Sequence, residues 1–201
     1  PIVERYDVIL FQESAQYIEP LMIFNKAQDL LAKEGHIFII DEFALQRSEI
    51  AASEGLHLLK DILQLSARLG FELVEHLDLS AKATPTLQYL LHAIDKHRQQ
   101  LLDDLDLQSS HLDQLMQSNQ DYLNKYVSGQ FGYALLHFRK TRQLLWRLYP
   151  LNTDQMPYML ALFEKIFKHK MSPAMWQWKY GLDQCKAIGI WSENALIAHY
   201  G

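Results

Sequence analysis

The chain has one cysteine, Cys185, in 201 residues. A single cysteine allows no intrachain disulfide and no multi-cysteine zinc or iron–sulfur site, so a reducing cytoplasm fits the chain best. The sequence has no apolar run near the roughly 18 residues that a membrane span needs, and it has no secretion signal. We therefore predict a cytoplasmic protein that has no membrane partner.

Basic runs and metal-ligand spacings are missing as well. The chain has 19 Lys and Arg against 24 Asp and Glu, a formal net charge of -5, and its cations are scattered. Such a balance gives no electrostatic footprint for nucleic acid, so we expect no nucleic-acid partner. Among the nine histidines, His36, His57 and His76 lie in different elements, and His92 and His97 fall on different faces of one expected helix. We therefore predict no metal site.

The first 77 residues alternate short apolar runs with helical patterns. Strands are predicted at 6–11, 36–40 and 71–77, and the first two read as fully buried because they lack polar alternation. A helix after Pro20 is expected to end at Gly35 as its cap, and a helix from Leu56 to Leu69 is expected to stop at Gly70. This order indicates βαβ units and a parallel sheet, and hence an α/β fold.

The rest of the chain divides into a helical stretch and a second unit. Residues 85–128 have helical spacing and are predicted to form an insertion, after which a strand returns at 133–139. A second unit is expected from residue 142. Its predicted elements are a strand at 144–149, an amphipathic helix capped by 152–154, and a hairpin of 187–191 and 195–200.

Two stretches of the first unit resemble a known enzyme family. Tyr6-Asp7-Val8-Ile9 and Leu31-Ala32-Lys33-Glu34-Gly35 resemble the F-D-V-I strand and the L-K-P-G-G-like turn of class I S-adenosylmethionine-dependent methyltransferases. Glu13-Ser14-Ala15-Gln16-Tyr17-Ile18 is similar to the E-S-x-E-H-M stretch of small-molecule and lipid-headgroup methyltransferases, with Gln16 and Tyr17 at the usual Glu and His positions. The resemblance covers roughly residues 3–140. It implies a partial Rossmann-like parallel sheet, namely strands four to seven of seven, and S-adenosylmethionine as cofactor.

Candidate site residues follow the first two strands, because ligands of open α/β sheets bind at the carboxyl ends of the strands. Methyl transfer needs an oriented acceptor and sometimes a base, and we predict Glu13 as the catalytic residue. An alternative is that Glu13 and Asp41 are solvated or cap the following helices. The residues predicted to bind a small-molecule substrate are Gln12, Ser14, Tyr17, Asp41, Glu42 and Phe43.

The second unit resembles another transferase family. Residues 148–155, the Met171-Ser172-Pro173 turn, the W-x-W-K-Y-G stretch at 176–181 and the final hairpin resemble the start of GNAT-type N-acetyltransferases. The resemblance implies a partial α+β domain and acetyl-CoA as a second cofactor. Trp176 and Trp178 are expected either to line an acyl-acceptor pocket or to pack in the core or in a contact between domains.

The eight glycines form no G-x-G turn, so we expect most of the cofactor-binding residues to lie outside this chain and assign none within it. The chain opens without Met, and we expect it to be a fragment of a methyltransferase–acetyltransferase fusion, with its boundary between residues 141 and 142. Two alternatives remain open. Acetyl transfer is the main activity of the whole protein, or the chain is a non-catalytic scaffold whose exposed sheet edge binds a partner or forms a homodimer.

Overall fold

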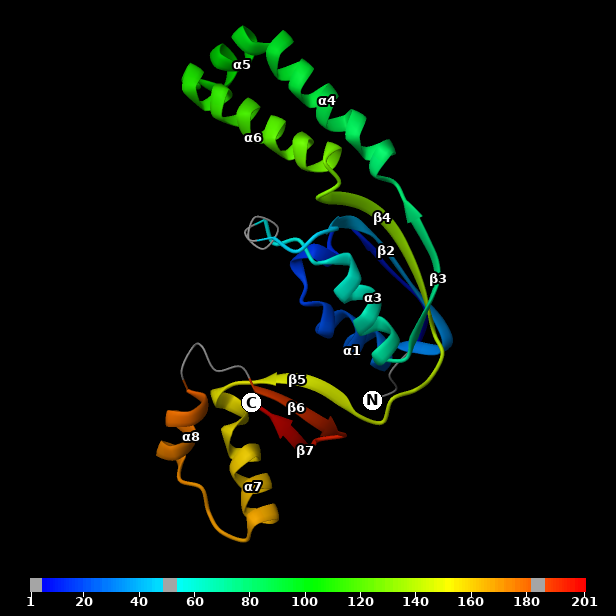
Figure 1. Cartoon of the computed structure of the whole chain (residues 1–201), viewed down its shortest axis with the longest axis vertical. Helices are drawn as coiled ribbons and strands as arrows, with labels where there is room; N and C mark the ends of the chain where they lie inside the picture. The colour runs from blue at the N-terminus through cyan, green and yellow to red at the C-terminus, as the bar shows by residue number, and fades with distance from the viewer. Residues whose placement is uncertain (1–4, 49–53, 182–186) are drawn as a thin grey trace.

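The computed structural model describes residues 5–48, 54–181 and 187–201, so Cys185 lies outside the described residues (Figure 1). The first unit contains β1 (Tyr6–Gln12), the 3-10 helix η1 (Ala15–Tyr17), α1 (Pro20–Leu30), β2 (Leu31–Ala44), α3 (Leu59–Arg68), β3 (Phe71–Asp78), α4 (Ser80–Lys96), α5 (Arg98–Leu105), α6 (Ser109–Val127) and β4 (Phe131–Lys140). The second contains β5 (Arg147–Leu151), the 3-10 helix η2 (Thr153–Gln155), α7 (Met156–Phe167), α8 (Pro173–Tyr180), β6 (Ala187–Ser192) and β7 (Ala195–Tyr200). Among the described helices, none combines the length and apolarity that crossing a membrane requires.

Four strands form the main sheet in the order β1-β2-β4-β3. β1 and β2 pair in parallel, whereas β4 is antiparallel to both of its neighbours. The prediction of a parallel sheet is therefore correct for the common direction of β1, β2 and β3 and wrong for β4. The reason is the helical insertion, because the chain leaves β3 and returns to β4 at the same end of the sheet.

Helices α1 and α3 lie together on one side of the sheet (Figure 1). The apolar core fills the space beneath them, where the ring of Phe24 on α1 lies 5.4 Å from Phe71 and 5.5 Å from Phe138, measured between centroids. Ile37 and Ile39 of β2 point into the same core and are fully buried. Alternation along β2 and β4 thus directs every second side chain into this core.

No described helix packs over the opposite side of the sheet (Figure 1). The side chains of Tyr6, Val8 and Leu10 on β1 are consequently 50%, 51% and 58% exposed. The prediction that β1 is fully buried is therefore wrong, because β1 is an edge strand and only its Ile9 and Phe11 side chains reach the core. β1 is therefore an apolar strand that has a neighbouring strand on one edge only, and no described helix covers its outer face.

Two glycines predicted to end helices behave differently. Gly70 follows α3 directly with φ +82°, as predicted, and a Cβ there would lie 2.8 Å from the Arg142 side chain. Gly35 does not cap α1, because α1 ends at Leu30 and β2 begins with the next residue. Instead, β2 is irregular before His36, and Glu34 adopts the positive φ of +63°.

The insertion consists of α4, α5 and α6, which extend from the sheet as a helical arm (Figure 1). α4 begins at Ser80 rather than at residue 85, so Pro85 lies inside the helix. The Asp78 carboxylate explains the earlier start, because its Oδ1 accepts hydrogen bonds from the backbone N–H and the hydroxyl of Ser80 at 2.9 and 2.6 Å. These hydrogen bonds also hold the pKa of Asp78 below its usual value.

The second unit has an antiparallel sheet in the order β5-β6-β7, with the predicted hairpin formed by β6 and β7. The predicted cap before α7 is confirmed as a capping box between Asn152 and Gln155 around η2. The aromatic stretch forms α8, in which Trp176 is 1% exposed and packs on Met159, whereas Trp178 is 74% exposed. The core interpretation therefore holds for Trp176 alone.

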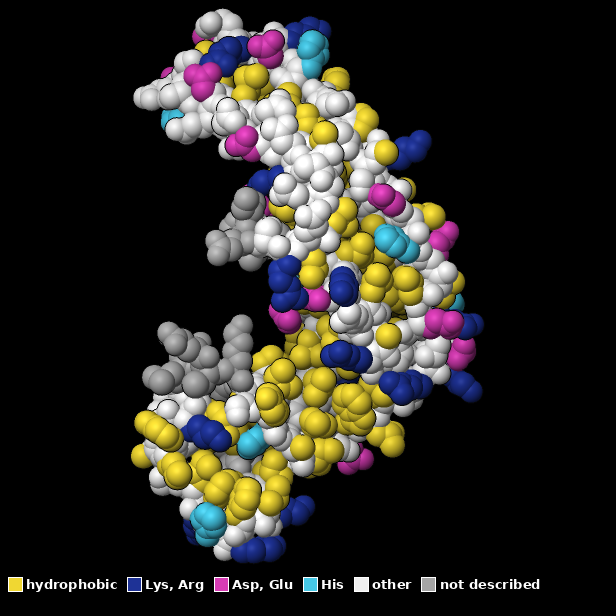
Figure 2. Space-filling view, in the orientation of Figure 1, with side chains coloured by type: hydrophobic (Ala, Val, Ile, Leu, Met, Phe, Trp, Pro, Cys, Tyr) yellow, Lys and Arg dark blue, Asp and Glu magenta, His cyan; other side chains and the backbone are white. Residues whose placement is uncertain are grey.

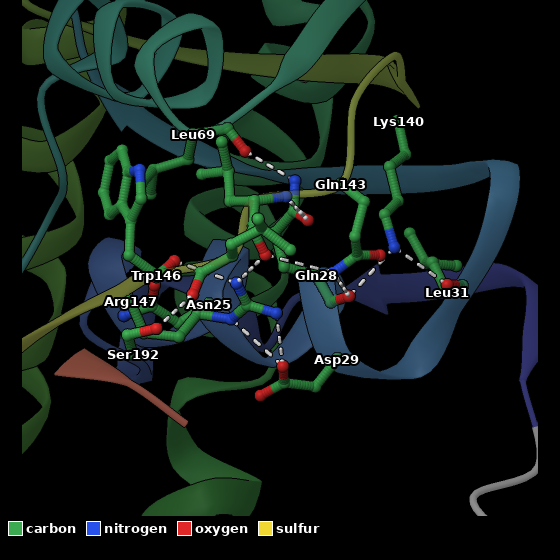
Figure 3. A network of polar contacts seen from close by, with 12 residues as sticks. Asn25, Gln28, Asp29, Leu31, Leu69, Lys140, Gln143, Trp146, Arg147 and Ser192 are labelled. Atoms are coloured by element: carbon green, nitrogen blue, oxygen red, sulfur yellow. Dashed lines mark hydrogen bonds and ion pairs between the residues drawn. The ribbon is translucent and has the colours of Figure 1, made fainter. Parts of the chain in front are cut away.

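A polar network joins the two units around α1 (Figure 3). The buried Gln28 amide donates to the Leu69 carbonyl at 2.7 Å and accepts from the Leu144 N–H at 3.2 Å. Arg147, the first residue of β5, donates to one oxygen of Asp29 from Nε and Nη2 at 3.0 and 2.5 Å. The segment between β4 and β5 is thereby held against the first unit, which explains why β5 starts three residues later than predicted.

Candidate functional site

β1 ends at Gln12, which pairs with Ile40, whereas β2 continues to Ala44. The prediction that the second strand ends at residue 40 is therefore wrong: Asp41, Glu42 and Phe43 lie within β2, because they pair with Ala134, Tyr133 and Gly132 of β4.

Beyond β1, Glu13 still donates its backbone N–H to the Ile40 carbonyl at 2.9 Å. Glu13 adopts φ +50°, a left-handed conformation that costs an L-residue about 1 kcal/mol. This conformation turns the chain out of β1 and leads directly into η1.

Asp41 holds that turn from the neighbouring strand. Its Oδ2 accepts the backbone N–H groups of Ala15 and Gln16 at 2.7 and 3.2 Å, and its Oδ1 accepts that of Glu42 at 2.9 Å. Ser14, which precedes η1, makes no side-chain cap of its own. Asp41 is 1% exposed, so its buried charge is compensated by three N–H donors. The arrangement fits the interpretation of Asp41 as a cap.

Glu42 faces the helical insertion instead. Its two carboxylate oxygens accept hydrogen bonds from Tyr122 and Tyr126 at 2.5 and 2.6 Å. The two tyrosines are four residues apart on α6 and therefore project from one face of that helix. Burial, reinforced by the hydrogen bonds to Glu42, raises the pKa of both phenols well above its usual value, so both remain donors. Glu42 thus fastens α6 to the end of β2.

Glu13 has a tyrosine partner as well. The Tyr133 hydroxyl on β4 donates to Glu13 Oε1 at 2.6 Å. Burial and the Glu13 carboxylate raise the pKa of Tyr133 above its usual value, so this phenol is also a donor. The Tyr133 backbone N–H is in turn held by the Ser80 hydroxyl at 3.0 Å, where α4 begins. The side chain of Glu13 is consequently oriented from across the sheet.

These groups surround a cavity of about 330 Å³ between the sheet and α4. It is lined by Glu13, Glu42, Ala83, Thr86, Leu87, Tyr126 and Tyr133. The lining includes two carboxylates and no basic side chain, so the cavity favours a neutral or cationic compound over an anion. Glu13 is placed to accept a proton from such a compound. In the described part of the chain, no group of three His, Cys, Asp or Glu side chains is arranged to hold a metal ion.

The remaining predicted residues lie around this cavity without lining it. Gln12 is exposed at the end of β1, Ser14 is half-buried before η1, and Tyr17 is 80% exposed. Phe43 is 2% exposed and packs in the core beneath the helices. The structure therefore brings together Glu13, Asp41 and Glu42. The catalytic role of Glu13 and the substrate-binding roles of Asp41, Glu42 and the other predicted residues all stay predictions.

The three tyrosines are the functional candidates that sequence reasoning missed. Tyr122 and Tyr126 lie in the segment predicted only as a helical insertion, and Tyr133 lies in a segment noted only as a strand. Their one usable signal is the spacing of four residues between Tyr122 and Tyr126, which places two phenols on one helix face. Nothing in the sequence indicates that this face meets Glu42.

Comparison with known proteins gives structural likeness only. No family model matches the chain, and no curated protein matches its sequence. Among solved structures, the cyclopropane synthase MmaA2 of Mycobacterium tuberculosis aligns with a TM-score of 0.57 and 14% identity over 69% of this chain and 57% of that one. A putative sarcosine dimethylglycine methyltransferase of Galdieria sulphuraria aligns with a TM-score of 0.58 and 14% identity over 69% and 54%.

A third neighbour is the O-methyltransferase of a trans-AT PKS multienzyme of Brevibacillus brevis, described in complex with S-adenosyl-L-homocysteine. It aligns with a TM-score of 0.51 and 20% identity over 70% of this chain and 46% of that one. The chain thus spans about half the length of these neighbours, of which one is described as a cyclopropane synthase and two as methyltransferases. At these identities the likeness concerns the fold: the chain has a mixed α/β architecture of the methyltransferase Rossmann-like type.

Proposed function

We propose that this chain is the carboxyl-terminal half of a methyltransferase domain, which transfers a methyl group from S-adenosylmethionine to a small molecule. The observation that carries the proposal is the cavity at the carboxyl ends of β1 and β2, where open α/β sheets bind their ligands. The likeness in fold to methyltransferases supports the reaction class.

The described residues do not by themselves fit the cofactor. They contain no G-x-G turn where backbone could approach an adenosine or a carboxylate closely. We therefore assign cofactor binding to a domain half outside this chain. The open edge of β1 and the uncovered face of the sheet, with Val8 and Leu10 half-exposed, support this assignment, because they offer an apolar surface for further strands and helices.

This chain's own contribution is to the acceptor. Glu13, oriented by Tyr133, would accept a proton from an acceptor amine or hydroxyl. Glu42 and its two tyrosines would hold the insertion against the cavity and limit the entry of water. Asp41 would keep the turn after β1 in place without touching the acceptor.

Calorimetric titration tests the proposal. S-adenosylmethionine is titrated into the 201-residue chain and into a version extended upstream through the expected Gly-rich turn. We expect no detectable binding of S-adenosylmethionine to the 201-residue chain and saturable binding to the extended version. Binding by the 201-residue chain would contradict the assignment of the cofactor site to another domain half. Absence of binding by both versions would contradict methyl transfer as the function.

For the second unit we propose N-acyl transfer from acetyl-CoA as an additional activity of the whole protein. The supporting observation is its element order, in which β5 is followed by α7 and α8 and then by the β6–β7 hairpin of one antiparallel sheet. This order agrees with the GNAT resemblance of residues 148–201. Release of coenzyme A from acetyl-CoA by a version extended downstream, with a set of amines as acceptors, is the test. If no amine gives turnover, acyl transfer is wrong and the second unit has a structural role.

A further inference from the structure

A second cavity lies at the other end of the main sheet, where β2 begins and β4 ends. Its volume is about 390 Å³, and its lining comes from three separate segments of the chain. Arg5 precedes β1, Lys33 and Glu34 belong to the irregular start of β2, and residues 140–143 lead from β4 toward β5. The cavity is therefore remote from Glu13 and Glu42, which lie at the carboxyl ends of β1 and β2.

The charge of this cavity is opposite to that of the chain. Four of its lining side chains are basic: Arg5, Lys33, Lys140 and Arg142. Glu34 is the one acid among the lining residues, and its carboxylate lies 3.9 Å from the guanidinium of Arg139. The whole chain carries a net charge of -5, so the local excess of positive charge does not follow from composition. Lys and Arg side chains gather where β4 passes toward β5, next to several acids (Figure 2).

Three of the four basic side chains, those of Arg5, Lys140 and Arg142, donate to backbone carbonyl oxygens instead of to carboxylates. Lys140 is 3% exposed, and its Nζ donates to the carbonyls of Gln28 and Leu31, each at 2.9 Å (Figure 3). Arg5 likewise donates to the Leu31 carbonyl, at 3.2 Å, and to that of Asp29, at 3.0 Å. Carbonyl dipoles orient a cation but leave its charge in place.

Arg142, in the segment between β4 and β5, also donates to a backbone carbonyl. Arg142 donates to the Arg68 carbonyl at 3.1 Å. Of the ion pairs formed by the described residues, none includes Arg5, Lys33, Lys140 or Arg142. The nearby Asp29 carboxylate pairs with Arg147, outside the residues that line the cavity.

Burying an ammonium group without a carboxylate is costly, and a bound anion would offset that cost. We propose that this cavity binds a phosphate group, carried by a phosphate monoester or present as the free ion. A phosphate presents several charged oxygens at once, which suits two guanidinium groups and two ammonium groups around one cavity. The volume exceeds that of a single phosphate severalfold, so there is room for the compound that carries it.

Calorimetric titration of the 201-residue chain with inorganic phosphate and with glycerol phosphate, at low salt and neutral pH, tests the proposal. The variant R5Q/R142Q removes two exposed cations from the cavity. R98Q makes the same kind of change on the insertion, where Arg98 pairs with Asp113 at 2.6 Å, and serves as the control. Thermal unfolding of each variant confirms that it is folded.

Saturable binding that weakens about tenfold or more in R5Q/R142Q and is unchanged in R98Q is the expected result. Equal affinities for the two probes identify the free ion as the ligand, whereas tighter binding of glycerol phosphate identifies a phosphorylated compound. Absence of binding, or an equal loss in the control, would overturn the proposal. Because no methyl donor is involved, either result is independent of the methyltransferase assignment.

Discussion

At the scale of single residues, the neighbouring carboxylates of Glu13 and Asp41 at the carboxyl end of β1 have different roles. Asp41 is surrounded by backbone N–H groups, whereas Glu13 is exposed and touches a single phenol. Because the oxygens of Asp41 accept backbone N–H groups, this carboxylate holds the backbone in place. Glu13 accepts a single hydrogen bond and therefore remains able to accept a proton. The following predictions separate the two roles.

Glu13→Gln should reduce methyl transfer by the complete protein by a factor of about 10² or more. The amide keeps the size of the side chain but is not a base, and the cofactor is expected to bind elsewhere. Steady-state kinetics and calorimetry with S-adenosylmethionine measure the two effects. Equal losses in catalysis and in cofactor affinity would contradict the assigned role.

Asp41→Ala should lower the free energy of unfolding by about 2 kcal/mol, because it leaves the N–H groups of Ala15 and Gln16 without their acceptor in a buried site. Urea denaturation measures the change. Asp61→Ala is the matched control, since its ion pair with Arg47 is exposed and should contribute less than about 1 kcal/mol. Similar costs for the two variants would exclude the capping role.

Lys140 makes stability depend on pH in the alkaline range. Burial, followed by the charges of Arg5 and Arg147, lowers its pKa from 10.5 to about 8. Between these two values the unfolded chain binds the proton and the folded chain does not, so the free energy of unfolding increases with pH. The gain between pH 8 and pH 9 should be about 1 kcal/mol.

Chemical denaturation at a series of pH values measures this slope. Lys140→Met should abolish it even though the variant is less stable at every pH. Above pH 10 the slope should reverse, because Tyr122, Tyr126 and Tyr133 keep their protons only in the folded chain. A wild-type slope of zero between pH 8 and 9 would show that the ammonium is not buried in solution.

At the scale of elements, the helical insertion has little core of its own. Ile94 is the buried residue of α4, α5 has none, and α6 buries Leu112, Leu123 and Tyr126. Its attachment to the sheet combines the hydrogen bonds from Tyr122 and Tyr126 to Glu42 with the apolar contacts of Tyr126 in the cluster that includes Ala44 and Phe131. Elements with few buried contacts open locally at low free energy.

Replacing both Tyr122 and Tyr126 by Phe should increase hydrogen exchange throughout α6 and α4 while leaving β2 and β4 protected. The double variant leaves Glu42 half-buried without its donors, a loss of about 2 kcal/mol or more. Tyr89→Phe, in a side chain of α4 that is 73% exposed, is the control and should change nothing. Unchanged exchange in the double variant would show that the insertion is held by apolar contacts.

Element prediction from the sequence succeeded where local signals are strong. The helix stop at Gly70 and the cap at residues 152–154 depend on a few adjacent residues, and both were predicted; the structure adds the positive φ of Gly70 and the partnership of Asn152 with Gln155. Gly35 failed as a cap because the pairing of β1 with β2 extends β2 back to Leu31, and pairing of distant segments overrides a local preference. The orientation of β4 could not be predicted for the same reason.

At the scale of the whole molecule, the helices that the structure describes cover the sheet on one side only. Tyr6, Val8 and Leu10 lie along an edge strand that can form further backbone hydrogen bonds. In the complete protein we expect another part of the polypeptide to cover this surface. In the isolated chain the same surface favours association between copies, as proposed for a homodimer.

Sedimentation velocity over a range of concentrations should therefore show self-association of the 201-residue chain. Val8→Lys combined with Leu10→Lys should make it monomeric, because charges along an edge strand oppose strand pairing. Tyr89→Lys on the exposed insertion is the control and should leave association unchanged. A wild-type chain that is monomeric at all concentrations would refute the expected dimer.

The sequence by itself determined most helices and strands, the general position of Glu13, Asp41 and Glu42, and the resemblance to methyltransferases. These features depend on periodicity and on strand ends, which are encoded by neighbouring residues. Only the tertiary structure decided that Asp41 caps η1, that three tyrosines from α6 and β4 meet two glutamates, and that Arg5, Lys33, Lys140 and Arg142 surround one cavity. Each of these groupings joins residues far apart in the chain, and a side chain's partner across the fold leaves no local pattern.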